Sequence, residues 1–135
     1  MIYQPLTWPF CWHSHGFLED IVADVPVFGI NSRVRRKLNE QLQLRGSDYL
    51  DMWADSKASI PVAKRMSEII TEYLRWRNDR FIPKDPCEIL LWSPDRHMRI
   101  ESVLLRLGSE FAISNDALAN IGSLSFEQFA SLVGA

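Results

Sequence analysis

The feature of this sequence that most restricts its fold is the helical spacing of apolar residues in the C-terminal half. After Pro61, apolar residues recur every three or four positions, at Val62, Met66, Ile69, Ile70, Tyr73 and Leu74. This spacing places the side chains on one face of an α-helix, and proline is favoured in the first turn of a helix. No alternating run of β-branched residues is long enough to indicate a strand. The sequence therefore predicts an all-α fold.

Helix start signals define the elements that follow this helix. A serine, a proline and an aspartate at 93–95 supply a cap and a favourable first turn, which predicts a helix from there to about Phe111. A short helix is predicted at 114–122, and a capping-box pattern at 125–128 predicts the last one. The segment 81–92 contains two prolines and is predicted to be a loop.

The N-terminal half is less regular than the C-terminal half. Residues 1–15 contain prolines and aromatic residues without a helical period, which predicts an extended arm lying against the domain. Apolar spacing predicts a helix at about 16–24 and a second one at 31–44, with a further turn of helix at 49–53.

Length and composition fit one folded domain. The chain has 135 residues, of which 47% are hydrophobic and 24% are charged, as in an ordinary globular protein. We therefore expect a small helical bundle that forms a single domain. It would consist of the arm (1–15), N-terminal helices (16–58) and a C-terminal helical bundle (59–135).

Charge and cysteine content restrict the class of partner. Fifteen basic against seventeen acidic residues give a net charge of −2, which argues against a nucleic-acid-binding protein. The two cysteines, Cys11 and Cys87, are too few for a disulfide framework and favour a reducing compartment. No signal peptide pattern is present, and no apolar run approaches the roughly 18 residues of a membrane span. We expect a cytoplasmic protein without a membrane partner; its oligomeric state stays open.

One group of residues has metal-binding chemistry. Cys11, His13 and His15 alternate, so an extended backbone would point all three side chains to one side. Thiolate and imidazole ligands suit zinc, but a closed site needs a fourth ligand with a paired spacing, which the neighbouring sequence lacks. The sequence therefore predicts no cofactor, and a metal site remains an alternative.

A basic cluster stands at the start of the predicted helix 31–44. Positive charge is unfavourable at a helix N-terminus, so the cluster indicates either a binding site for an acidic partner or a solvated face. A second polar group stands near the start of the helix predicted after residue 92. The residues considered for partner binding are Arg33, Arg35, Arg36, Lys37, Ser93, Arg96 and His97.

The segments VAKRMSEIITEYL, FIPKDPCEILLWSPD, RIESVLLRLGSEF, NDALANI and SFEQFASLV resemble, in order and apolar spacing, the layout of an acyl carrier protein. The resemblance implies a carrier-like helical fold for the C-terminal half. That family attaches phosphopantetheine to serine in an Asp-Ser-Leu motif at the head of its second helix. Here Arg96, His97 and Met98 occupy the matching positions, and Ser93 lies one turn earlier without the motif. The resemblance therefore implies a carrier-like protein without the phosphopantetheine group.

These observations predict a non-enzymatic protein-interaction module with an unknown protein partner, and the resemblance describes it as a degenerate carrier. No nucleophile elbow, P-loop or dinucleotide motif is present, so no catalytic residue is predicted. Two alternatives stay open. One is a genuine carrier protein modified at a non-standard serine, and the other is a small metal-dependent enzyme or regulator that uses Cys11, His13 and His15.

Overall fold

The computed structural model of the protein describes residues 3–9, 30–94 and 100–133. Within these ranges the chain forms helices and no strand, which confirms the predicted all-α class. The elements are α2 (Ile30–Gln43), η3 (Ser47–Trp53), α3 (Ile60–Leu74), α4 (Cys87–Leu90), α5 (Ile100–Phe111), α6 (Asn115–Leu118), η4 (Ile121–Ser123) and α7 (Phe126–Ala130). The helix predicted at 16–24 and the predicted helix start after Pro94 lie outside the described residues.

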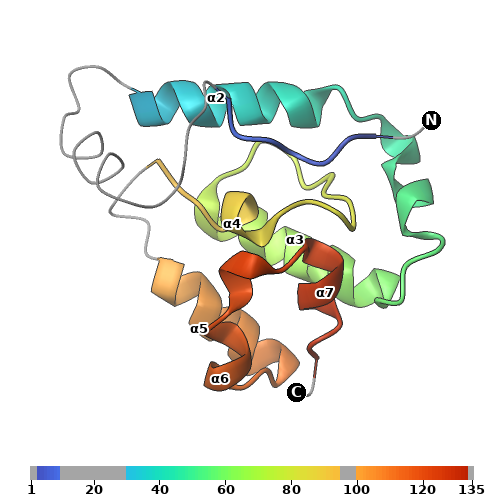
Figure 1. Ribbon diagram of the computed structural model, residues 1–135, viewed down its shortest axis with the longest axis vertical. Coiled ribbons are helices and arrows are strands. Elements are labelled where there is room, and N and C mark those ends of the chain that lie inside the picture. The colour runs from blue at the N-terminus through green and yellow to red at the C-terminus, as the bar shows by residue number, and fades with distance from the viewer. Residues whose placement is uncertain (1–2, 10–29, 95–99, 134–135) are drawn as a thin grey trace.

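Figure 1 shows α2 and the extended arm (residues 3–9) on one side of the molecule and helices α5 to α7 on the other. Helices α3 and α4 and the segment that joins them lie between these two sides (Figure 1). Helix α3 contacts both α5 and α7, and η4 contacts α4. Among the described residues, no helix has the length and apolar character needed to cross a membrane.

The long helices form where the apolar spacing predicted them. The narrow stripe of α2, formed by Val34, Leu38 and Leu42, is fully buried. Helix α3 ends at Leu74 because Arg75 adopts a left-handed conformation with a φ of 56°, which stops the helical hydrogen-bond pattern. The buried apolar side chains of the arm, α2, α3 and the C-terminal helices belong to one hydrophobic core.

The predicted loop 81–92 contains an additional element. Cys87–Leu90 form the short helix α4, and Pro86 precedes it as the N-cap residue in an extended conformation. The segment in front of α4 pairs with the start of α7: the Phe126 amide donates to the Asp85 carbonyl at 2.8 Å, and the Cys87 amide donates to the Leu124 carbonyl at 3.0 Å. The sequence pattern did not predict this pairing, because the pattern is local and the paired segments are far apart in the chain.

Local capping signals in the C-terminal part are confirmed. The Ser114 hydroxyl accepts from the Ala117 amide at the start of α6. At the start of α7, Ser125 and Gln128 exchange hydrogen bonds in the predicted capping box. Ser59 precedes α3 as expected, but its side chain makes no capping hydrogen bond.

A buried ion pair joins segments that are far apart in the sequence. Arg45, just after α2, donates from both terminal nitrogens to the Asp85 carboxylate, at 2.7 and 2.8 Å, and both side chains are buried. The same carboxylate accepts from the backbone amides of Leu6 in the arm and Ile82. Arg45 also donates to the carbonyls of Gln4 and Arg80, so each terminal nitrogen of its guanidinium and each oxygen of the Asp85 carboxylate takes part in two hydrogen bonds.

Arg35 does not belong to an exposed basic cluster, which corrects the interpretation made from the sequence. Its side chain is only 7% exposed, and its guanidinium lies 3.9 Å from the centre of the Trp76 ring. It donates to the carbonyl of Leu74, the last residue of α3, and to that of Trp92. Carbonyls at a helix C-terminus lack intrahelical partners and attract positive charge, which explains why a guanidinium that donates to two carbonyls is buried here. Burial lowers the pKa of Arg35 to about 10, so it stays charged at neutral pH.

We expect Asp85→Asn to reduce the free energy of unfolding by about 3–5 kcal/mol, because it leaves the buried Arg45 charge uncompensated. Urea denaturation followed by tryptophan fluorescence measures this change. The exposed Asp55 offers a matched control, and Asp55→Asn should change the stability by less than about 0.5 kcal/mol. A loss below about 1 kcal/mol for Asp85→Asn would contradict the role assigned to the pair.

Arg35→Ala should cost about 2–4 kcal/mol, since two buried carbonyls lose their donor and the contact with Trp76 is lost. The neighbouring Arg36 is exposed, so Arg36→Ala should leave the stability within about 0.5 kcal/mol of the wild type. The same denaturation experiment compares the two variants. An equal change in unfolding free energy for the two variants would contradict the burial of Arg35 and would support the solvated face predicted from the sequence.

Candidate functional site

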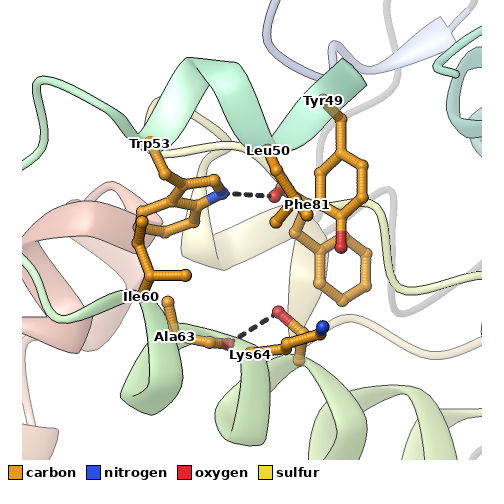
Figure 2. A pocket seen from close by; sticks show the side chains of 8 residues that line it. Tyr49, Leu50, Trp53, Ile60, Ala63, Lys64 and Phe81 are labelled. Atoms are coloured by element: carbon orange, nitrogen blue, oxygen red, sulfur yellow. Dashed lines mark hydrogen bonds between the residues drawn. The ribbon is translucent and has the colours of Figure 1, made fainter. Parts of the chain in front are cut away.

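A small apolar pocket lies between η3 and α3, and we refer to it as the η3–α3 pocket. Figure 2 shows Tyr49, Leu50 and Trp53 entering it from η3, and Ile60, Ala63 and Lys64 from α3. The complete lining consists of Tyr49, Leu50, Trp53, Ile60, Ala63, Lys64, Ser67 and Phe81. The pocket encloses about 10 Å³ of water-accessible space, and about 220 Å³ when its open mouth is included. This interior accommodates one methyl-sized or water-sized group.

The floor of the pocket is held in place by contacts within the core. The Trp53 indole N–H donates to the Phe81 carbonyl at 3.0 Å (Figure 2), and the Trp53 ring meets the edge of Phe126 with centroids 5.5 Å apart. The Ser67 hydroxyl donates to the Ala63 carbonyl at 2.8 Å. The polar groups of the floor therefore have partners within the protein, and the floor offers apolar contact to a ligand.

The rim of the pocket exposes two large aliphatic side chains. Leu50 is 37% exposed and Ile60 is 42% exposed, and both line the pocket mouth. Ile60 is the first residue of α3 and lies outside the buried stripe of that helix. Apolar rim residues around a preformed depression are a common property of protein-binding surfaces.

One end of the pocket has hydrogen-bonding capacity. Figure 2 shows the Tyr49 hydroxyl and the Lys64 ammonium group toward the end away from Trp53 and Ile60. Neither group has a hydrogen-bond or ion-pair partner among the residues that the structure describes. Burial raises the pKa of Tyr49, and the nearby Asp79 adds to this rise while Arg80 opposes it. The hydroxyl is therefore protonated at neutral pH, and both groups are donors.

Of the residues predicted for partner binding, the five that the structure describes differ in exposure, and Arg35 is buried. Arg33 and Arg36 are exposed on α2, and Lys37 is 3.4 Å from Glu40 on the same helix. Arg35 is buried and reaches the carbonyl of Trp92, which directly precedes the half-buried Ser93. Arg96 and His97 lie outside the described residues.

The described residues offer no alternative metal centre. Cys11, His13 and His15 lie outside the described residues, and no group of three metal-ligating side chains occurs within them. The thiol of Cys87 is buried at the start of α4. Burial, together with the Asp85 charge, raises the pKa of this thiol above its usual range, so it is a packing residue rather than a nucleophile.

Two open grooves of about 490 and 480 Å³ also occur on the surface. The first lies between the arm and the end of α2, beside Leu44, which is 82% exposed. The amide side chain of Gln41 there binds both backbone groups of Thr7, and Pro5 has no amide hydrogen, so this edge of the arm offers little to a pairing strand. The second lies beside η3 and is lined by Asp51, Met52, Asp55, Ser56, Pro83, Lys84 and Glu127.

Sequence reasoning did not identify the η3–α3 pocket as a site. It predicted the turn at 49–53 and the helix that begins near Ile60, but not that η3 and α3 enclose a depression. The available signal was Ile60 itself, an aliphatic residue outside the apolar stripe that packs α3. Such a residue is expected to be exposed, and an exposed aliphatic side chain beside a second one indicates a contact surface.

Comparison with known protein families, curated proteins and solved structures gives no significant match to this chain.

Proposed function

We propose that this protein is a non-enzymatic protein-interaction module whose docking site is the η3–α3 pocket. The observation that carries the proposal is the pair of exposed aliphatic residues, Leu50 and Ile60, at the mouth of a pocket with a fixed aromatic floor. An aliphatic side chain of a partner protein fits this depression. Binding would remove both rim residues from water, which supplies the driving force.

The chemistry of the lining favours binding over catalysis. The Ser67 hydroxyl donates to a backbone carbonyl of its own helix, and the lining residues that the structure describes include no histidine or carboxylate to activate it, so it is not arranged as a nucleophile. A pocket of this size holds the tip of one side chain and not a whole small-molecule substrate. Its dimensions therefore suit an anchor residue of a larger partner.

The acyl-carrier-like layout is part of this proposal for the C-terminal half. The order of α3, α5, α6 and α7 along the chain supports it. A pantetheine-sized mass increase on Ser93 after treatment with a phosphopantetheinyl transferase would favour the alternative of a functional carrier. An unchanged intact mass is expected for the module proposed here.

Replacing Ile60 by serine should weaken partner capture at least about fivefold, because the apolar contact at the rim is lost. The measurement is quantitative mass spectrometry of proteins retained from the native host by the immobilised wild type and variant. The matched control is Leu105→Ser on α5, since Leu105 is 71% exposed but does not line the pocket. The proposal requires a retained protein that depends on Ile60 and not on Leu105.

Equal retention by all three proteins would contradict the proposal. Sedimentation experiments provide a second criterion, because the pocket could bind another copy of this chain. A dimer in the wild type that Ile60→Ser abolishes and Leu105→Ser preserves would assign the pocket to self-association, which also contradicts the proposal.

A further inference from the structure

The two ends of the η3–α3 pocket differ in chemistry, and this difference specifies what kind of residue it accepts. Trp53 and Ile60 form an apolar end, whereas the Tyr49 hydroxyl and the Lys64 ammonium lie toward the other end (Figure 2). The charged groups that act on the Tyr49 hydroxyl, Asp79 and Arg80, have opposite signs. Among the described residues, Lys64 is the one charged side chain in the pocket lining, and its positive charge is complementary to an anion.

The two residues that mark the ends of the pocket on α3 lie one helical turn apart at the backbone. Ile60 and Lys64 are four positions apart, so their Cα atoms are separated by about 6 Å along the helix axis. A branched aliphatic residue at a chain terminus spans a comparable length from its methyl groups to its own carboxylate. An acidic side chain at the next position of an extended peptide would instead point to the opposite side.

From this arrangement we infer that the η3–α3 pocket binds the C-terminal residue of a partner polypeptide, a branched aliphatic residue with a free carboxylate. The aliphatic side chain contacts Trp53 and Ile60, and the carboxylate accepts hydrogen bonds from Tyr49 and Lys64. The enclosed space of about 10 Å³ admits one methyl group. This inference rests on the function proposed above and specifies its partner by chemistry.

The test uses three short peptides as probes against the full chain. They are acetyl-Gly-Gly-Leu with a free carboxylate, the same peptide with a C-terminal amide, and acetyl-Gly-Gly-Gly with a free carboxylate. Binding is followed by the NMR shift of the Trp53 indole N–H, a group that lies in the pocket floor. We expect the leucine acid to bind about fivefold more tightly than its amide, as for a partly exposed ion pair with an added hydrogen bond. The glycine acid should bind more weakly than either.

Two variants show whether Lys64 causes the preference. Lys64→Gln should make the leucine acid and amide bind equally, and added salt should have the same effect on the wild type. Lys57→Gln is the matched control, because Lys57 is exposed and does not line the pocket. It should preserve the preference for the acid.

The outcomes separate this inference from the proposed function. Equal binding of acid and amide to the wild type would overturn the carboxylate inference alone, and so would a glycine acid that binds as well as the leucine acid. A preference that Lys64→Gln leaves intact would also overturn it. No shift of the Trp53 signal with any peptide at millimolar concentrations would overturn both the inference and the assignment of the pocket as a docking site.

Discussion

The bidentate contact between Arg45 and Asp85 determines the path of the chain in this protein. Removing two charges from water is costly, and the cost is offset only when both groups are fully hydrogen-bonded. Here the carboxylate also accepts from the amides of Leu6 in the arm and of Ile82, and the terminal nitrogens of the guanidinium also donate to the carbonyls of Gln4 and Arg80. The pair therefore requires three segments to meet, and a fold in which one of them is displaced leaves a buried charge unsatisfied.

The candidate site depends on this contact through its floor. Phe81 lies between Arg80, whose carbonyl binds Arg45, and Ile82, whose amide binds Asp85. The carbonyl of Phe81 in turn orients the Trp53 indole. The floor of the pocket is thus fixed by interactions that a ligand does not touch, whereas the rim is formed by exposed side chains of η3 and α3. A rigid floor reduces the entropy that a partner must overcome on binding.

Most helices could be predicted because their signals are local. Caps, prolines and apolar spacing act within a few residues, and Ser125 with Gln128 forms the predicted capping box. The burial of Arg35 could not be predicted in the same way. Arg35 and Arg36 are equivalent in the local pattern, and only the carbonyls of Leu74 and Trp92, 39 and 57 residues away, distinguish them. The pocket was missed for a related reason, since it forms where two separately predicted helices meet.

The arm has a consequence for how the protein is made. Its Leu6 amide binds a carboxylate 79 residues later in the sequence, so the arm leaves the ribosome long before its binding site exists. At about 5–20 residues per second this interval is on the order of 4–16 s. During that time Leu6 and Trp8, an aliphatic and an aromatic side chain that the folded protein shields, are exposed on the nascent chain. The arm is then a segment that chaperones can bind during synthesis and that closes onto the fold only after Asp85 has emerged.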